Sequence, residues 1–493
     1  MEILSALSLF LIFLLVLLFI SSVRKQQRRI HLLPPGPTPI PLLGTPSFIT
    51  MDSACKYPKL QKKYGDIFTI WLLSDPVVVL CGYDVVKDAL INHAEEFSGR
   101  PLQPLADKHS QGYNFESSNT HWRYFRRYIL TTLRNIGLGK KPLEERCLME
   151  AKQLIEAVSE TEGKPFNPIH LLACAVFNFI NAILFGQQLD YSDKKLQECI
   201  LHTRKHVDNV LNKASQVCAM FPVFLKIPFL WKFLCRGTLR LHFFVKEQID
   251  FHKQTLDANS PRDFVDFFLL KIKEEEDNPD SIFCDVSLLM NITGLLAAAT
   301  DSTSCTLKYC LSVIAQFPDI QAKVQQEIDV VTGSQRLPQI SDRSCMPYTN
   351  AVIHELQRHL DIAPIALYHA LTKDTIFHGY SLPKGTRIIP YLSSVLFDPT
   401  QWETPNKFNP AHFLDEKGQF RMKPAFLVFS AGKRECLGVN LARMEIFIFI
   451  SALIQKFTFY AVSRGGLELR CPKTVKMNFI LSSEIRAVPR SSN

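Results

Sequence analysis

The spacing of apolar residues follows the period of a helix along most of this chain. After residue 50, apolar side chains recur every three to four positions through long stretches, which indicates helices with one buried face. Alternation at period two is confined to short runs, which are typical of strands. We predict a mostly α fold with small β-sheets. The expected helices are 52–64, 84–93, 119–135, 141–159, 168–185, 193–213, 238–256, 283–316, 319–331, 348–359 and 438–456, and the expected strands are 67–72, 76–81, 376–378, 386–390 and 476–482.

The N-terminus departs from this pattern with an unbroken apolar run. The segment Ile3–Val23 has 21 residues and no charge, and at about 1.5 Å per residue such a helix crosses the hydrocarbon core of a bilayer. A basic cluster follows at 24–29, which places the rest of the chain in the cytosol. A cleaved signal peptide is the alternative, but its apolar core would be shorter. We predict a transmembrane anchor over 1–23, a basic and proline-rich connector over 24–41 and one large domain over 42–493.

Composition narrows the class of protein. The chain has 493 residues, of which 47% are hydrophobic and 21% charged, which is globular rather than disordered. The net charge of +9 is spread along the chain, which argues against a nucleic-acid protein and fits an acidic partner or an anionic membrane surface. The 13 cysteines are scattered without a CxxC pair or zinc spacing, so we expect free thiols in a reducing compartment.

A polar run interrupts one of the apolar helices. Residues 295–307 read LLAAATDSTSCTL, with apolar stretches on both sides. Serine, threonine and aspartate are poor helix-interior residues because their side chains compete for backbone hydrogen bonds, and a buried aspartate must be paired or shifted in pKa. The stability of the helix does not explain this run, so its residues are candidates for a functional site. The alternative is that the hydroxyls bond back to their own helix.

A cysteine between two glycines is the second candidate. Residues 429–438 read FSAGKRECLG and precede an apolar helix. Gly432 permits a tight turn, and Cys436 is expected at a helix N-terminus, where unpaired N–H groups and the helix dipole favour a thiolate. Lys433 and Arg434 add positive charge. Such a thiolate is a metal ligand or a nucleophile, and a buried structural cysteine is equally open on these residues alone.

The same stretch resembles a known signature. Phe429, Gly432, Arg434, Cys436 and Gly438 occupy the fixed positions of the haem-binding signature of the cytochrome P450 family. The resemblance covers nearly the whole chain and is nearest to the vertebrate microsomal enzymes of family 2. It implies a cytochrome P450-like haem domain over 42–493, in which Cys436 is the proximal thiolate ligand of haem b, iron protoporphyrin IX. A thiolate there donates electron density to iron and favours O–O cleavage.

The resemblance also assigns the sequence HELQR at 354–358. Glu355 and Arg358 share a helix face and match the E-x-x-R pair of the family, which a downstream loop completes. FNPAHF at 408–413 resembles that loop, so His412 is the implied third member. The implied role is structural, since removing one partner strands a buried charge. Without the resemblance, such a pair would be interpreted as a surface ion pair.

Two further groups follow from the resemblance. Haem propionates are carboxylates that need donors, and the implied donors are Arg100, Trp122, Arg126, His369 and Arg434. A basic surface of the family docks an acidic electron-transfer partner, and the matching residues here are Arg127, Arg134 and Lys140. Read singly, each of these residues has an ordinary role on the surface or in the core.

By the same resemblance, the polar run matches the oxygen-activation motif of the family. An acid and an adjacent hydroxyl relay protons to dioxygen; Asp301 is the implied acid and Ser302 the hydroxyl, with Thr303 beside them. We expect broken helix bonding here, with room for oxygen and water. Ala299 replaces the usual glycine and Ser302 the usual threonine. Both departures raise the expectation of uncoupling, which is peroxide release without product.

The implied substrate pocket is mostly apolar, which suits a lipophilic substrate. Ala298 is expected at its roof, next to the haem, where it counts among the cofactor contacts as well. The positions that match the family segments are Leu102, Phe115, Ala298, Ile365, Ala366 and Phe479. Fatty acids, steroids and xenobiotics all fit such a lining.

The resemblance thus implies a monooxygenase of the endoplasmic reticulum membrane that inserts one atom of O2 into a lipophilic substrate. Electrons would come from NADPH through NADPH–cytochrome P450 reductase, with cytochrome b5 as a further partner, because the chain has no GxGxxG or flavin motif of its own. The alternatives are a haem protein with lost activity that acts as a sensor or carrier, an isomerase or peroxide-using enzyme without a reductase, and a membrane-anchored scaffold without haem.

Overall fold

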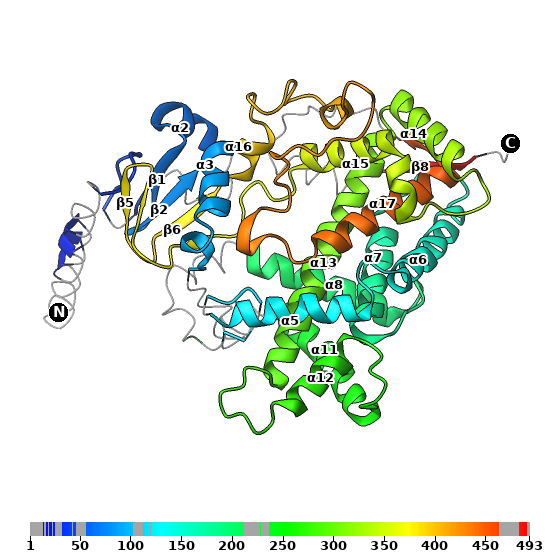
Figure 1. Cartoon of the computed structure of the whole chain (residues 1–493), viewed down its shortest axis with the longest axis horizontal. Helices are drawn as coiled ribbons and strands as arrows, with labels where there is room; N and C mark the ends of the chain where they lie inside the picture. The colour runs from blue at the N-terminus through cyan, green and yellow to red at the C-terminus, as the bar shows by residue number, and fades with distance from the viewer. Residues whose placement is uncertain are drawn as a thin grey trace, which may run out of the picture. The chain divides into compact units, whose positions relative to one another are not determined.

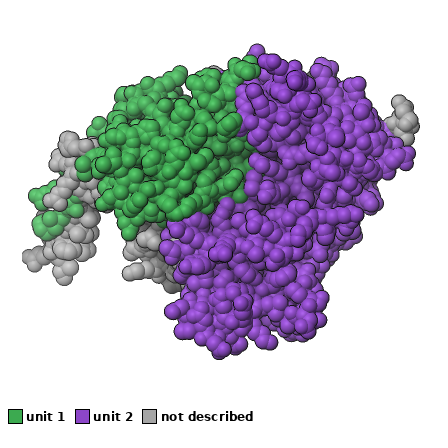
Figure 2. Space-filling view, viewed as in Figure 1, with its two compact units in different colours: residues 1–101, 363–405, 424–436 green, residues 102–362, 406–423, 437–493 purple. Residues whose placement is uncertain are grey.

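The chain folds into helices with a few small sheets, as the computed structural model in Figure 1 shows. The structure describes residues 13, 16–17, 19–21, 23–24, 32–41, 43–45, 56–101, 112–113, 115–118, 120–211, 227, 236–462 and 483–490. Two compact units divide the chain (Figure 2). Unit 1 comprises Met1–Pro101, Ala363–Pro405 and Pro424–Cys436, and unit 2 comprises Leu102–Ile362, Asn406–Lys423 and Leu437–Asn493.

Unit 1 is built on a four-stranded sheet of order β1-β2-β6-β3. The valines at 77–79 in β2 have no exposed surface, so this strand is an unbroken apolar run buried on both faces. The strands are β1 (Ile67–Leu72), β2 (Asp75–Leu80), β3 (His369–Ala370) and β6 (Arg387–Pro390), and β4 (Thr375–Phe377) pairs with β5 (Tyr380–Leu382) as a separate hairpin. The helical elements are α2 (Tyr57–Tyr64), α3 (Tyr83–Lys87), η3 (Asp88–Asn92), η4 (Glu96–Ser98), α16 (Leu392–Leu396) and η8 (Gly432–Arg434).

Unit 2 is a helical body around the 30-residue helix α13, which contacts α7, α8, α11, α15 and α17 (Figure 1). Helix α7 is apolar on nearly all sides and is therefore buried. The helices are α5 (His121–Ile136), α6 (Lys141–Ser159), α7 (Ile169–Phe185), α8 (Lys194–Leu211), α11 (Arg236–Thr255), α12 (Phe264–Glu274), α13 (Asp285–Ile314), α14 (Pro318–Val331), η6 (Ile340–Cys345), α15 (Pro347–Leu360), η7 (Pro410–Phe413) and α17 (Val439–Lys456). A two-stranded sheet, β7 (Phe457–Ala461) with β8 (Ile485–Pro489), completes it.

The predicted mostly helical fold with small sheets is confirmed. The bounds of α6 and β1 are those that the sequence pattern predicts, and α6 begins with a proline in its first turn, as α2, α14 and α15 also do. Helix α12 was not predicted, because its apolar residues form one short block, FVDFFLL, without a clear helical period. Strand β7 was missed because it continues α17 without a polar break. The expected strand at 476–482 lies outside the described residues.

The predicted anchor over 1–23 lies mostly outside the described residues. The described positions between 13 and 24 are helical, and several carry exposed apolar side chains. Within the described part of the chain, no helix combines the length and the apolar character needed to cross a membrane.

Candidate active site

The loop that ends at Cys436 is held by its own backbone. The Cys436 amide donates to the Phe429 carbonyl oxygen over 3.0 Å, which closes the loop. Gly432 has a φ of +74°, and a Cβ there would overlap the Leu90 carbonyl oxygen, so only glycine fits. The Cys436 side chain is exposed, and none of the nine described cysteines forms a disulfide. Helix α17 starts with Gly438 as its N-cap, so Cys436 lies just before the helix rather than in its first turn.

Three of the five predicted carboxylate donors lie together in unit 1. Arg434 Nε donates to the Ser98 carbonyl over 2.9 Å, and Arg100 Nη1 donates to two main-chain carbonyls over 3.0 Å each. His369 Nδ1 lies 2.6 Å from the Phe97 carbonyl, so Nδ1 carries the proton. All three side chains are buried. Main-chain carbonyl oxygens accept from all three side chains and so fix their orientation.

The other two predicted donors, Trp122 and Arg126, belong to unit 2. They stand one turn apart on the same face of α5, where Trp122 is buried and Arg126 half-buried. The residues proposed for docking lie on an exposed surface of the same unit. Arg127 and Arg134 are two turns apart on α5, and Lys140 precedes α6. The structure therefore presents these three cations to solvent.

The polar run of α13 does not interrupt the helix. Ser302 Oγ donates to the Ala298 carbonyl over 2.7 Å, Ser304 Oγ to the Thr300 carbonyl over 2.7 Å, and Thr306 Oγ1 to the Ser302 carbonyl over 2.8 Å. The expected break in helix bonding is therefore absent, because the hydroxyls add to the backbone hydrogen bonds instead of replacing them. The buried Thr300 Oγ1 is different, since it has no hydrogen-bond partner within the described residues.

Asp301 and Ser302 have different surroundings although they are adjacent. Asp301 is half-buried, and burial raises the pKa of its carboxyl; Arg204 of α8 lowers that pKa and Asp208 raises it. Ser302 and Ala298 are one turn apart on an exposed face of α13, whereas Thr303 is buried. The acid therefore faces α8, while the hydroxyl lies on an open face.

Phe115 packs against α13 one turn before Ala298. Its amide donates to Asn291 Oδ1 over 3.0 Å, and a Cβ at Gly294 would lie 2.9 Å from the Phe115 ring. Gly294 is one turn before Ala298, so the ring packs where the helix has no side chain. Two of the six predicted pocket positions, Phe115 and Ala298, are thus close to one surface.

The other four predicted pocket positions lie in unit 1 or outside the described residues. Ile365 packs against the apolar core of unit 1, and Ala366 is buried with its amide bonded to the Pro390 carbonyl. Leu102 and Phe479 lie outside the described residues.

Glu355, Arg358 and His412 form one buried network. Arg358 donates through Nε and Nη2 to the two Glu355 carboxylate oxygens, each over 2.7 Å, and Nη2 also reaches the Lys407 carbonyl at 3.2 Å. Glu355 Oε1 accepts from the Asn409 amide at 2.9 Å and lies 3.2 Å from His412 Nδ1. The three side chains are fully buried. The network fastens α15 to the loop around η7, as the E-x-x-R interpretation expects.

Comparison with known proteins agrees with this geometry. The sequence profile of Cytochrome P450 matches residues 34–481. The chain is 42% identical over 451 residues to cytochrome P450 2C20 of Macaca fascicularis, covering 91% of this chain and 92% of the relative. It is 40% identical over 455 residues to cytochrome P450 2C8 of Homo sapiens, covering 92% and 93%. The chain belongs to the cytochrome P450 family. Membership in this monooxygenase family implies haem with a cysteine thiolate ligand and O2 as co-substrate.

The donor cluster of unit 1 fits the propionates of a cytochrome P450. Burial lowers the pKa of His369 to about 3, and the nearby charges of Arg100 and Arg434 contribute to the lowering. His369 is therefore neutral, with Nε2 free of a proton. A carboxylate bound beside these three side chains would accept hydrogen bonds from the guanidinium groups and would favour the protonated form of His369.

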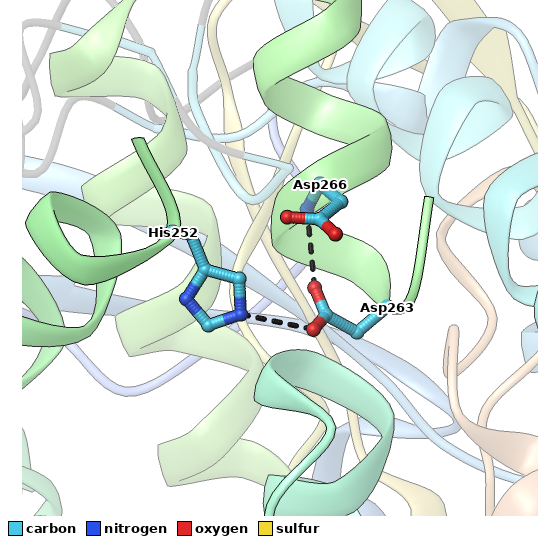
Figure 3. Close-up of side chains that lie close together, drawn as sticks. All are labelled: His252, Asp263 and Asp266. Atoms are coloured by element: carbon cyan, nitrogen blue, oxygen red, sulfur yellow. Dashed lines mark hydrogen bonds and ion pairs between the residues drawn. The ribbon is translucent and has the colours of Figure 1, made fainter. Parts of the chain in front are cut away.

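A buried histidine–carboxylate cluster was not found by sequence reasoning (Figure 3). His252 Nδ1 lies 2.7 Å from the Gln248 carbonyl and Nε2 lies 2.9 Å from Asp263 Oδ2, so both ring nitrogens donate and the ring is an imidazolium. Asp263 caps α12 by accepting from the Asp266 amide, and Arg262 pairs with Asp266. Two carboxylates, one guanidinium and one imidazolium balance in charge, so a metal ion is not needed. The cluster joins α11 to α12.

Proposed function

We propose that this cytochrome P450 is a membrane-bound enzyme that inserts one atom of O2 into a lipophilic substrate, with electrons from NADPH delivered by a flavoprotein reductase. The observation that carries the proposal is the unit 1 arrangement, in which the exposed Cys436 thiol ends a loop closed by a main-chain hydrogen bond and Arg434 of the same loop lies with the buried Arg100 and His369. A cysteine thiolate is one of the ligands that proteins supply to haem iron, and cationic donors suit the two propionates of the haem.

Cys436 would ligate the iron, and Arg100, Arg434 and His369 would hold the propionates, with Trp122 and Arg126 as the proposed donors from unit 2. When bound, the haem supplies an iron that binds O2 and cleaves its O–O bond. Lys433 is paired with Glu95, so its charge is directed toward that carboxylate and not toward Cys436. Thiolate formation then depends on the loop amides and on the ligated metal.

Asp301 and Ser302 would move protons. Burial raises the pKa of Asp301 toward the working pH, which suits a group that must both give and regain a proton. Ser302 Oγ donates its own proton to the Ala298 carbonyl, so its lone pairs are available to accept a hydrogen bond from water. In this assignment Asp301 transfers the proton and Ser302 holds the water, with the buried Thr303 beside them supporting the helix face.

An apolar stretch of α13 supports a lipophilic substrate. Phe115 packs at Gly294, one turn before the exposed Ala298, and Ser302 lies one further turn along the helix. Such a surface suits a lipophilic compound and leaves most of its orientation to shape. Fatty acids, steroids and xenobiotics therefore form the substrate set to test, and positions 102, 365, 366 and 479 stay proposals for the pocket.

Membrane and partner assignments rest on charge and hydropathy. The apolar segment 1–23 followed by a basic cluster is proposed as a single-pass anchor of the endoplasmic reticulum membrane with the catalytic domain in the cytosol. Arg127, Arg134 and Lys140 are exposed cations on one side of unit 2 and are proposed to dock an acidic reductase, with cytochrome b5 as a second partner.

Reconstituted turnover tests the proposal. The full chain in lipid, with NADPH and the flavoprotein reductase, is given a polyunsaturated fatty acid, a steroid and an aromatic xenobiotic under isotopically labelled O2. A product that carries one labelled oxygen is expected, and Cys436→Ser is expected to abolish it. Cys345→Ser is the matched control, because that free thiol is exposed in η6 of unit 2.

The other outcomes separate the rival functions. NADPH consumption with peroxide and no labelled product indicates that oxygen is activated but wasted. Intact haem without NADPH consumption contradicts the reductase-dependent proposal and favours a sensor, an isomerase or a peroxide-using enzyme. A colourless protein contradicts every haem-based function.

A further inference from the structure

Asn291 of α13 holds two residues of the loop that precedes α5. It is fully buried, and its Oδ1 accepts from the Phe115 amide over 3.0 Å. Its Nδ2 donates to the Tyr113 carbonyl over 3.3 Å and to the Ser287 carbonyl, one turn back on α13, over 2.8 Å. Only one orientation of the side-chain amide satisfies all three partners, so Asn291 is fixed on its own helix and holds the loop from there.

Gly294, one turn after Asn291, makes room for the Phe115 ring. A Cβ at Gly294 would lie 2.9 Å from Phe115 Cε1 and 3.4 Å from Cζ, so a side chain there would push the ring away. A glycine inside a helix is less favourable than an alanine. The stability of α13 therefore does not explain this glycine, whereas the close approach of the ring to the helix backbone does.

Helix α5 holds the same loop at Tyr113. The Tyr113 ring stacks on the ring of His121, the first residue of α5, with centroids 5.6 Å apart and planes inclined by 13°. Removal of the Asn291 side chain leaves this contact in place, so the loop stays attached to the body of unit 2. We therefore expect the change to be local, at the backbone of Phe115 and at the position of its ring.

The ring lies on the face of α13 that carries groups proposed for the reaction. Gly294, Ala298 and Ser302 follow one another at intervals of one turn, and the last two are exposed. A ligand along this face would meet the Phe115 ring, the Ala298 methyl and the Ser302 hydroxyl in turn. A ring displaced outward from Gly294 takes space from a ligand beside Ala298, and a wide, rigid ligand loses more by this than a slim, flexible one.

We propose that Asn291 is a positioning residue for Phe115 and that, together with Gly294, it makes the Phe115 ring a determinant of the width of the substrate. Asn291 and Gly294 hold the ring close to α13, which leaves room for wide, rigid compounds beside Ala298. Loss of either residue lets the ring stand further from the helix and favours slim, flexible chains. The inference rests on the proposed function, because this face of α13 meets a substrate only in that function.

Two haem-ligating probes test the inference without turnover. Octylimidazole and adamantylimidazole both bind haem iron through an imidazole nitrogen, and they differ in the width of the attached group. Their dissociation constants are measured from the haem absorbance shift of the full-length, haem-loaded protein. We expect Gly294→Ala and Asn291→Leu each to weaken adamantylimidazole relative to octylimidazole by about tenfold, the order that a small change in an apolar pocket gives. Gly294→Ala should retain its fold, because alanine is the better helix former.

Two controls separate the ring from a general loss of structure. In a Phe115→Ala background, both effects should fall below about twofold, because no ring remains to be displaced. Asn178→Leu is the matched control for Asn291→Leu. Asn178 of α7 is also fully buried and holds the main chain of a loop, donating to the Leu189 carbonyl over 2.6 Å and accepting from the Leu189 amide over 3.1 Å. Asn178→Leu should lower stability and leave the ratio of the two dissociation constants unchanged.

The outcomes distinguish the inference from the function. A protein that binds no haem contradicts the proposed function and the inference with it. If haem is bound but Gly294→Ala or Asn291→Leu has the native ratio, the function stands and the inference is overturned. The inference is equally overturned if the effect of Asn291→Leu persists in the Phe115→Ala background or is reproduced by Asn178→Leu. Should Asn291→Leu not fold, Asn291→Ala replaces it with the same expected ratio.

Discussion

The Cys436 loop and the polar run of α13 carry groups proposed for one reaction, yet the fold holds them in opposite ways. The loop depends on the main-chain carbonyls of Leu90 and Ser98, which are distant in sequence, and on a glycine at 432 in the left-handed region. In the run, the hydroxyls of Ser302, Ser304 and Thr306 donate to carbonyls one turn back on the same helix. We expect substitutions in the loop to damage structure and haem binding together. Substitutions in the run should change chemistry and leave stability almost untouched.

Gly432→Ala is the strongest test of the loop. The added Cβ overlaps the Leu90 carbonyl, and the φ of +74° disfavours any side chain, so we expect a loss of roughly 2–5 kcal/mol in unfolding free energy. Haem content and denaturant unfolding measure the two effects. Gly385→Ala is the control, because Gly385 has a similar φ of +80° but open space around its Cβ position. If both variants behave alike, the close contact with the Leu90 carbonyl is not what holds the loop.

The same contrast explains which parts of the fold could be predicted. Helix α6 and strand β1 follow from periodicity and a first-turn proline, because those signals are local. Helix α12 was missed because its apolar residues form one short block without a clear helical period, although the N-cap Asp263 is a local signal. Local signals therefore account for most elements, and the missed ones are short or lack a clear period or polar boundary.

The candidate site shows the same limit at the level of side chains. Glu355 and Arg358 are three residues apart, but their link to His412 came from family resemblance rather than from spacing. The pairing of Asp88 with His378 spans 290 residues, and nothing in the local sequence marks it. The direction of the Ser302 hydroxyl toward the Ala298 carbonyl was the alternative interpretation at the sequence level, and the structure shows it. The catalytic roles stay proposals.

Asp301→Asn tests the proposed proton-transfer role of the acid in the polar run. The amide keeps the shape of the side chain but cannot transfer a proton, so we expect product formation to fall by about 10²-fold, the lower end for general acid catalysis. Stability should be unchanged or slightly higher, since burial already penalises the charged form of Asp301. Product rate and denaturant unfolding are measured in parallel.

Asp208→Asn is the matched control for Asp301. Asp208 lies on α8 and raises the pKa of Asp301 through its charge, so its removal lowers that pKa while the transferring carboxyl remains. The control should retain most product formation and shift its pH profile toward acid. Equal losses in the two variants would show that charge near α8, rather than proton transfer by Asp301, limits the reaction.

Substitution of Ser302 should affect the reaction less than substitution of Asp301 on the same helix. Ser302→Ala removes the group proposed to hold water, so the fraction of NADPH that ends as peroxide should rise several-fold while the unfolding free energy changes by about 0.5 kcal/mol or less. Ser302→Thr keeps the hydroxyl and its bond to the Ala298 carbonyl and adds a methyl that restricts the rotamer. Peroxide should then fall below the native level. A rise in both variants contradicts the proposed role of the hydroxyl.

Lys308 of α13, unlike the hydroxyls of the polar run, bonds to a segment outside its own helix. Its side chain is fully buried, and Nζ donates to Asn167 Oδ1 of another segment over 2.6 Å. Burial lowers the pKa of Lys308 from 10.5 to about 8, so the unfolded chain binds more protons than the folded one between these values. Stability should therefore rise with pH across that window. Lys308→Met should abolish this dependence and, by removing the cost of a buried cation, stabilise the protein at pH 7 by about 1–3 kcal/mol.

The exposed Lys152→Met is the control and should retain the native pH dependence. If Lys308→Met destabilises the protein instead, the bond to Asn167 outweighs desolvation, and α13 relies on its neighbours as strongly as the Cys436 loop does.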